Sequence, residues 1–156
     1  MIAHVVAYDE NRLIGQNGTL PWHYKEDLQY FKALTQGKTV LMGRKTYQSI
    51  LDRLQKPLPN RTNVVVSKTL VDDRVHVVRD LDAYLNTAQD DIYIIGGASI
   101  YEATLARADR LYITHIDAAY DGDTFYPAWN PGDFKSLESR ISGPLRFAVY
   151  ERTSHD

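Results

Sequence analysis

The sequence predicts a single α/β domain, with a mostly parallel central sheet flanked by helices and closed by a C-terminal antiparallel hairpin. Strand-like and helix-like segments alternate along most of the chain. Two of the strand-like segments, Val64–Val66 and Ile92–Ile95, are continuous apolar runs, as expected of parallel strands covered on both faces. The length of 156 residues suits one compact domain spanning residues 1–156.

The individual elements follow from local periodicity and turn residues. The predicted strands are Ile2–Tyr8, Lys38–Gly43, Thr62–Ser67, Val75–Val78, Asp91–Gly96 and Arg110–Ile116. Helices with apolar residues three or four positions apart are predicted at Tyr24–Thr35, Lys45 to about Leu51, Leu81–Thr87 and Ser99–Arg107. The closing hairpin is expected from Phe134–Ile141 and Leu145–Arg152, which flank Ser142-Gly143-Pro144.

Two connections, Asp9–His23 and Asp117–Asp133, are longer than most connections in compact domains, which favours a functional role. In the first, Gly15 and Gly18 are candidate hinges before Leu20-Pro21-Trp22, so a mobile flap is predicted. An ordinary surface connection is the alternative.

Composition excludes several classes of function. The 18 basic and 20 acidic residues nearly balance and form no basic block, so nucleic acid is not an expected partner. The chain has no cysteine, and its five histidines are scattered, so no metal site is expected. We find no membrane span, and the apolar start lacks a basic leader, so a cytoplasmic protein is expected.

Asp27 is the most unusual charge in the sequence, because it falls on the apolar side of a predicted helix. At about 100° per residue it shares that side with Tyr24, Leu28, Phe31 and Leu34, while the other charged residues lie opposite. An ionised carboxylate in the interior costs several kcal/mol unless it is hydrogen-bonded. Asp27 therefore needs a partner from the protein or from a ligand, although the helix dipole alone commonly explains an acid in a first turn.

Two residues elsewhere are candidate partners for this carboxylate. Thr114, within the predicted strand Arg110–Ile116, has a hydroxyl that can satisfy Asp27. Trp22 precedes the helix, and its indole N–H can hold a water near the carboxylate. Packing in the core is the commoner role of a tryptophan.

The turn Gly96-Gly97-Ala98 joins a predicted strand to a predicted helix. Glycines there let a phosphate approach the backbone, and the helix dipole favours an anion. A tight turn explains the glycine pair equally well, and the spacing differs from the dinucleotide fingerprint Gly-x-Gly-x-x-Gly.

The segment Gly43-Arg44-Lys45-Thr46 repeats this arrangement, with two cations where the helix dipole disfavours them. A bound phosphate would explain their position, and a solvated pair of charges is the alternative. Lys68, just after Ser67, can add a third cation to the same anion. These residues indicate a dinucleotide with an additional phosphate, hence NADP rather than NAD.

The ordered series of motifs resembles dihydrofolate reductase over nearly the whole chain. The matching segments are Leu20-Pro-Trp-His23, Asp27-Leu28, Phe31-Lys32, Val40-Leu-Met-Gly-Arg-Lys-Thr46, Ser49-Ile50, Pro57-Leu-Pro-Asn-Arg61, Ile95-Gly-Gly97, Tyr101, Tyr112-Ile-Thr-His115 and Gly122-Asp-Thr124. Each motif is modest alone, but the series in this order and spacing is highly specific.

The resemblance implies NADPH-dependent reduction of 7,8-dihydrofolate to tetrahydrofolate. Hydride adds to C6 and water protonates N5, while Asp27 anchors the pterin and raises the basicity of N5 electrostatically. The implied catalytic residues are Asp27, Trp22, Leu20 and Thr114. The implied substrate-binding residues are Val5, Asp27, Leu28, Phe31, Ile50, Leu58, Arg61, Ile95 and Thr114.

The same resemblance implies the cofactor site. Arg44, Lys45 and Thr46 would hold phosphates, and Ala7, Ile14 and Leu20 would border the nicotinamide. The complete implied set is Ala7, Ile14, Gly15, Leu20, Gly43, Arg44, Lys45, Thr46, Ser67, Lys68, Ile95, Gly96, Gly97, Ala98, Ser99, Ile100 and Tyr101. Expected ligands are dihydrofolate and antifolate inhibitors, and the protein is expected to be a monomer.

Three features depart from the family pattern: Lys25 where proline is common, Ala98 in place of a third glycine, and a longer link at Leu51–Lys56. The nearest enzymatic alternative is a pyrimidine reductase of the riboflavin pathway, which needs a ribose-phosphate site in place of Asp27 and Trp22. A non-catalytic NADPH-binding sensor is the alternative from another class.

Overall fold

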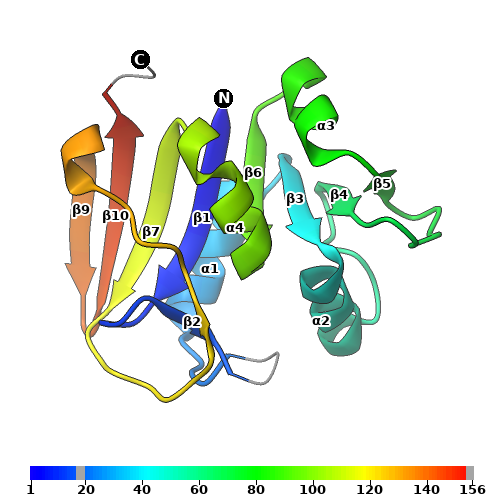
Figure 1. Cartoon of the computed structure of the whole chain (residues 1–156). Coiled ribbons are helices and arrows are strands. Elements are labelled where there is room, and N and C mark those ends of the chain that lie inside the picture. The colour runs from blue at the N-terminus through cyan, green and yellow to red at the C-terminus, as the bar shows by residue number, and fades with distance from the viewer. Residues whose placement is uncertain (17–19, 154–156) are drawn as a thin grey trace.

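The computed structural model describes residues 1–16 and 20–153, and its centre is an eight-stranded sheet (Figure 1). The strands of this sheet are β1 (Ile2–Tyr8), β3 (Thr39–Gly43), β4 (Thr62–Val66), β5 (His76–Val78), β6 (Ile92–Gly96), β7 (Arg110–Ile116), β9 (Phe134–Ser142) and β10 (Leu145–Arg152). Their order is β5-β4-β3-β6-β1-β7-β10-β9. The strands from β5 to β7 in this order are parallel, and β10 pairs antiparallel with β7 and β9, which confirms the predicted fold class.

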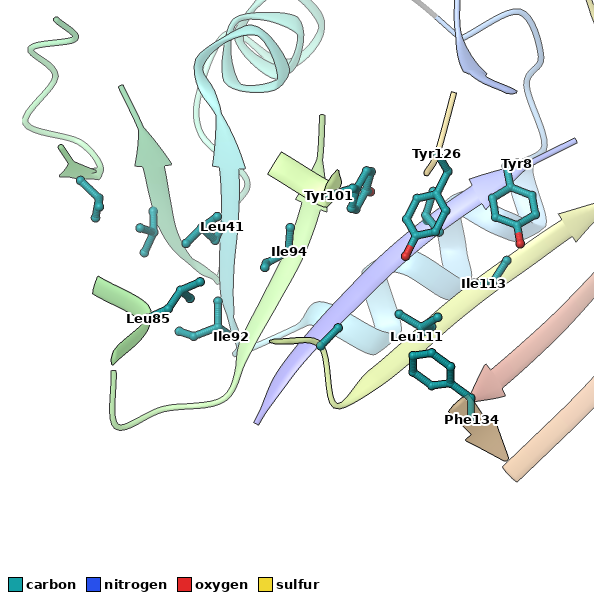
Figure 2. Packing of buried hydrophobic residues seen from close by; sticks show 14 residues of the cluster. Tyr8, Leu41, Leu85, Ile92, Ile94, Tyr101, Leu111, Ile113, Tyr126 and Phe134 are labelled. Carbon is teal, nitrogen blue, oxygen red and sulfur yellow. The ribbon is translucent and has the colours of Figure 1, made fainter. Parts of the chain in front are cut away.

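Helices cover both faces of the sheet. They are α1 (Lys25–Thr35), α2 (Arg44–Leu54), α3 (Leu81–Thr87) and α4 (Ala98–Thr104). Figure 1 shows α4 in front of β1 and α1 behind it. Side chains of α3 and α4 pack into one buried cluster, part of which is drawn in Figure 2, and side chains of α1 and α2 pack into another. Successive residues of a strand point to opposite faces, so Val5 joins the second cluster and Val6 the first.

The predicted end of the second helix was wrong. We expected a helix from Lys45 to about Leu51 and then a link, but α2 continues to Leu54. Leu51 and Leu54 pack against the apolar cluster under α2, so the apolar spacing of the helix extends through them. Gln55 then ends the helix in a left-handed conformation with φ 65°.

The fourth predicted helix, Ser99–Arg107, was too long. Helix α4 ends at Thr104, and a short 3-10 turn, Leu105–Arg107, follows. The Thr104 hydroxyl donates to the Ile100 carbonyl (2.7 Å) and lies 2.7 Å from His4 Nε2. Thr104 is thus bonded both to the backbone of its own helix and to a side chain of β1. The change from α-helix to 3-10 turn occurs directly after it.

Each of the two long connections contains a short strand that we did not predict. Strand β2 (Leu13–Gly15) lies in the first and pairs antiparallel with β8 (Thr124–Phe125) in the second. A further 3-10 turn occupies Pro131–Asp133. Strands of two or three residues are too short to show an alternating pattern, which explains the omission. The candidate hinge Gly18 lies outside the described residues.

The pairing of β2 with β8 brings the flap segment and the 117–133 loop side by side, and Figure 1 shows them together below the sheet. The Asp123 N–H donates to the Gly15 carbonyl at 3.2 Å. A Cβ atom at Gly122 would lie 2.6 Å from the same carbonyl oxygen, so only glycine permits this approach. None of the helices in the described part of the chain is long and apolar enough to cross a membrane.

Candidate active site

The predicted pairing of Asp27 and Thr114 is present. Asp27 lies in the first turn of α1, and Thr114 lies in β7 with its side chain on the face that α1 covers. The Thr114 hydroxyl donates to Asp27 Oδ1 at 2.7 Å, and Thr114 is 2% exposed. Burial raises the pKa of Asp27 above its ordinary value, and the hydrogen bond from Thr114 lowers it by a smaller amount. Asp27 is thus a desolvated carboxyl with a fixed orientation.

The apolar face of α1 is rotated slightly from our prediction. Asp27, Phe31 and Leu34 are half-buried as expected, but Leu28 is 42% exposed. Tyr30 is half-buried instead, because its ring packs on Phe147 of β10 at 4.6 Å between centroids. The helix therefore turns toward β10, and Leu28 lies at the edge of the buried side.

Five of the implied substrate-binding residues belong to one apolar cluster, which does not include Leu28. Val5, Ile50 and Leu58 are buried within it, and Phe31 and Ile95 pack against it partly exposed. Their elements differ: β1, α2, the loop before β4, α1 and β6. The sheet and the two helices thus bring together residues that are far apart in the sequence, on the same face as Asp27.

Arg61 is held at the edge of this cluster. Its Nε donates to the Pro59 carbonyl at 2.9 Å, and its Nη1 donates to the Thr35 hydroxyl at 3.1 Å. Its guanidinium carbon lies 5.9 Å from the Phe31 ring centroid. Burial lowers the pKa of Arg61 below its usual value. Arginine has five N–H donors, so these two bonds orient the group and leave donors for an anion.

Asn63 positions the Arg61 loop, and our sequence reasoning did not identify it. Its side chain is buried, accepts from the Leu58 N–H at 3.1 Å, and donates to the carbonyls of Leu58 (2.9 Å) and Arg61 (3.1 Å). The sequence signal that could have identified Asn63 is its position as a polar residue directly before the apolar run Val64–Val66.

The two glycine turns lie against each other. A Cβ atom at Gly96 would lie 3.2 Å from Thr46 Oγ1, and one at Gly43 would lie 3.2 Å from Ile100 Cγ1. Helix α2 has no acid in its first turn and no side-chain cap. The N-terminal turns of α2 and α4 therefore meet at the carboxyl ends of the neighbouring strands β3 and β6, with Arg44 and Lys45 exposed beside them.

Arg44 reaches the loop after β4, in which Ser67 and Lys68 precede Thr69. Its Nη1 donates to the Thr69 hydroxyl at 3.1 Å. Arg79, which we did not single out, supports this loop by donating to the carbonyls of Ser67 and Leu70, both at 2.8 Å. Arg79 is a single arginine directly after β5, and no pattern in the sequence indicated that it supports the loop after β4.

Tyr101, another implied cofactor residue, is 3% exposed. Its hydroxyl donates to the Val5 carbonyl at 2.6 Å, and burial raises its pKa. The hydroxyl thus fixes β1 where it passes the site, and the carbonyl oxygen keeps a second lone pair for a ligand.

Most of the other implied residues belong to the flap segment between β1 and α1. Ala7 and Ile14 are half-buried, Gly15 is buried within β2, and Leu20 is 50% exposed. Trp22 is half-buried and packs beside Tyr120, with 5.2 Å between ring centroids.

Acidic and histidine side chains in the described part of the chain form no group suited to a metal ion.

Comparisons with known proteins agree with this geometry. A sequence model of the family described as dihydrofolate reductase matches residues 1–151. A dihydrofolate reductase type 3 of Salmonella typhimurium is 44% identical over 142 residues, which cover 88% of this chain and 85% of that protein. Dihydrofolate reductase HdrB of Haloferax volcanii is 39% identical over 158 residues, covering 95% of this chain and 81% of that protein.

A solved structure shares the whole fold. It is a dihydrofolate reductase from Enterococcus faecalis complexed with NADP(H) and RAB-propyl, and its similarity has a TM-score of 0.86 at 28% sequence identity. The match covers 99% of this chain and 97% of that chain.

Proposed function

The chain belongs to the dihydrofolate reductase family, whose members carry out NADPH-dependent reduction of dihydrofolate, and from this premise we propose which of its residues perform the reaction. The observation that carries the proposal is the desolvated Asp27 carboxyl, oriented by Thr114 on the substrate face of the sheet. A pyrimidine reductase of the riboflavin pathway is no longer a candidate, because the family assignment covers residues 1–151.

Asp27 anchors the pterin by accepting hydrogen bonds from its ring N–H and 2-amino group. Thr114 holds one carboxylate oxygen, which leaves the other oxygen and a second lone pair for the ligand. The charge of Asp27 sits in a partly desolvated environment, so it interacts with the pterin more strongly than it would in water. Its role is to orient the ring and raise the basicity of N5.

The proton for N5 comes from water. Trp22 and Leu20 lie in the flap segment that leads into α1. We assign the indole N–H the role of holding that water and Leu20 the role of controlling its access. The chemistry that NADPH supplies, when it is bound, is the hydride for C6. The N5 proton and the C6 hydride together complete the reduction of one C=N bond.

The rest of the folate follows the apolar cluster toward Arg61. Phe31, Ile50 and Leu58 form walls for the pterin and aminobenzoyl rings, with Leu28 at the exposed edge. Arg61 meets the α-carboxylate of the glutamate with the N–H groups that Pro59 and Thr35 do not use.

The residues around the two glycine turns fit an NADPH molecule. Gly43 and Gly96 let the two turns pack closely, because a side chain at either position would crowd Ile100 or Thr46. The absence of side chains at Gly43, Gly96 and Gly97 lets a pyrophosphate approach the backbone. Arg44 and Lys45 supply positive charge at the start of α2, and Arg44 reaches the Ser67–Leu70 loop beside Lys68. The additional phosphate of NADPH belongs at this loop.

The direct test is NADPH oxidation by the purified protein in the presence of 7,8-dihydrofolate. We expect turnover that requires both compounds and is inhibited by methotrexate. A protein that binds NADPH without turnover and without binding methotrexate would instead be a sensor.

Replacing Arg44 with alanine tests the phosphate assignment. Loss of charge-assisted hydrogen bonds to phosphate predicts a KM for NADPH raised about 10–100-fold, with little change in the KM for NADH. The matched control is Lys135→Ala on the edge strand β9, which removes the same charge elsewhere and should change neither KM. Equal losses with both cofactors would place the additional phosphate away from Arg44.

We also infer a cytoplasmic monomer that binds small molecules and neither nucleic acid nor membranes. The nearly balanced charge supports this inference. Light scattering of the purified protein tests the monomer directly, because a dimer would double the mass of 17.8 kDa.

A further inference from the structure

We infer that Tyr120 is a positioning residue for the reaction: it holds Trp22 and the start of α1 in the arrangement that lets Asp27 bind the pterin. This inference rests on the proposed roles of Asp27 and Trp22. Tyr120 lies in the 117–133 loop, and its side chain contacts Tyr24 and Trp22, so we assign it an action through these residues.

The backbone of Tyr120 is fixed by a buried carboxylate. Asp9 follows β1 directly and is 2% exposed. Its Oδ2 accepts from the Tyr120 N–H at 2.8 Å, and its Oδ1 accepts from the N–H groups of Asn11 and Leu13, both at 2.9 Å. One side chain therefore ties the root of the flap to the 117–133 loop at Tyr120.

The side chain of Tyr120 makes two contacts on the substrate side. Its hydroxyl lies 2.6 Å from the hydroxyl of Tyr24, and its ring lies 5.2 Å from the ring of Trp22. The hydrogen bond between the two tyrosines, with a smaller contribution from burial, raises the pKa of Tyr24 to about 12. Tyr120 thus reaches two of the three residues that lead from the flap into α1.

Tyr24 is the point through which α1 is held. It is the N-cap residue, and its carbonyl accepts the Leu28 N–H at 3.2 Å, the first hydrogen bond of the helix. No side chain caps this helix end, so its first turn depends on outside contacts for a fixed position. Asp27 lies in that turn, and its distance to Thr114 depends on where the turn is placed.

The carboxyl and its helical turn are supported from different elements, including β9, where Ser142 and Arg140 bond Glu26. Thr114 holds the carboxyl from the sheet, and the chain Asp9, Tyr120, Tyr24 holds its helix from the two loops. If the loop support is lost, the competent arrangement becomes a smaller fraction of the population, and apparent substrate affinity and turnover fall by that fraction. One hydroxyl–hydroxyl bond corresponds to a decrease of about fivefold.

The test compares Tyr120→Phe, Tyr24→Phe and the double variant. Each single change removes the shared hydrogen bond and keeps the rings. We expect kcat/KM for dihydrofolate to fall about fivefold in each single variant and to fall no further in the double variant, while the dissociation constant of NADPH stays within twofold. Independent effects that multiply to about 25-fold, an unchanged kcat/KM, or an equal loss of NADPH affinity would each overturn the inference.

The control is Tyr150→Phe, which removes a tyrosine hydroxyl bonded to His115 Nε2 at 2.9 Å on the opposite face of the sheet. We expect it to lower the melting temperature about as much as Tyr120→Phe does and to leave kcat/KM unchanged. If Tyr150→Phe lowers kcat/KM equally, the effect of Tyr120 is general destabilisation and the inference fails.

Trp22 provides a spectroscopic reading of the same contact. The chain has two tryptophans, so Trp129→Phe leaves Trp22 as the only one. In that background Tyr120→Ala removes the ring beside Trp22, and we expect a red shift of its emission with a loss of kcat/KM greater than tenfold. An unchanged emission would show that Tyr120 does not hold Trp22.

The proposed function and the role of Tyr120 fail in different ways. A wild-type protein without any dihydrofolate turnover would refute the proposed function itself. An active wild type with unaffected variants would refute only the role of Tyr120.

Discussion

Asp9 and Asp27 are both removed from solvent near the same end of the sheet, but they are satisfied differently. Asp9 is 2% exposed and accepts three backbone N–H groups. Asp27 is half-buried and, among the described residues, accepts one hydroxyl, from Thr114. A buried carboxylate with its oxygens occupied is part of the structure, whereas one with spare acceptor capacity is suited to a ligand.

The largest expected effect is the loss of activity in Asp27→Asn. This substitution keeps the shape of the side chain and removes the negative charge of the carboxylate. We expect kcat/KM for dihydrofolate near neutral pH to fall about 100–1,000-fold, because the fixed charge that favours protonation of N5 is lost. Part of the activity should return at acid pH, where dihydrofolate is protonated before it binds. A pH profile of kcat/KM measures this, and a profile parallel to that of the wild type would contradict the role of Asp27.

Asp9→Ala should affect stability more than chemistry. It leaves three backbone N–H groups without their acceptor, each in a buried or part-buried position. We expect the free energy of unfolding in urea to fall by about 3 kcal/mol. The loss of kcat should stay below the loss for Asp27→Asn. If Asp9→Ala abolished turnover and left stability unchanged, Asp9 would belong to the catalytic group and the comparison would fail.

How much of this contrast could be predicted from the sequence depends on the range of the interactions. Asp27 was found because helix periodicity is local, and the eight strands of the sheet begin and end within one residue of the predicted segments. The local strand-to-helix pattern gave Arg44 and the glycine turns, and the motif series added Arg61. Asp9 was not singled out, because its partner Tyr120 is 111 residues away and no local pattern joins them.

The remaining omissions have other physical causes. Asn63 acts on its own loop but looks like the edge of a strand, and Arg79 acts through carbonyl groups that any residues provide. The extension of α2 to Leu54 was missed because we took the residues after Leu51 as an inserted link. Leu51 and Leu54 are held by packing against the cluster, which becomes evident only when the sheet is in place.

His4 extends the comparison to a buried base. It is fully buried in β1, with Nδ1 2.8 Å from the Tyr126 hydroxyl and Nε2 2.7 Å from the Thr104 hydroxyl. Burial, with a smaller contribution from Arg152, lowers the pKa of His4 to about 3. The unfolded chain binds a proton near pH 6.5 and the folded chain only near pH 3, so this contribution to stability is complete above pH 6.5 and is lost as the pH falls below it.

The expected size of this loss is about 2–3 kcal/mol between pH 7 and pH 4.5. Urea unfolding of the wild type and of His4→Gln at both pH values isolates it, because contributions common to both proteins cancel. His115, whose pKa burial lowers to about 4, is one such common contribution. If the two proteins lose equal stability on acidification, His4 is not the group that titrates.

The smallest expected effect concerns the stability of Asp27→Asn. Because burial raises the pKa of Asp27, its ionised form costs free energy in the folded protein, and this cost grows as the pH rises through the folded pKa. Asparagine removes the charge and can still accept from Thr114 through its amide oxygen. We therefore expect the variant to be more stable than the wild type by about 0.5–1 kcal/mol at pH 7. The gain should disappear near pH 3.5, where the carboxyl is protonated in both states.

Urea unfolding at the two pH values measures this difference, and Asp9→Asn is the matched comparison. At Asp9 the same change replaces an acceptor of three N–H groups by an amide, so it should destabilise the protein at pH 7. If the free energy of unfolding falls in Asp9→Asn and rises in Asp27→Asn, the charge of Asp9 stabilises the fold and the charge of Asp27 destabilises it. A loss of stability at both positions would mean that the charge of Asp27 is already stabilised without a ligand.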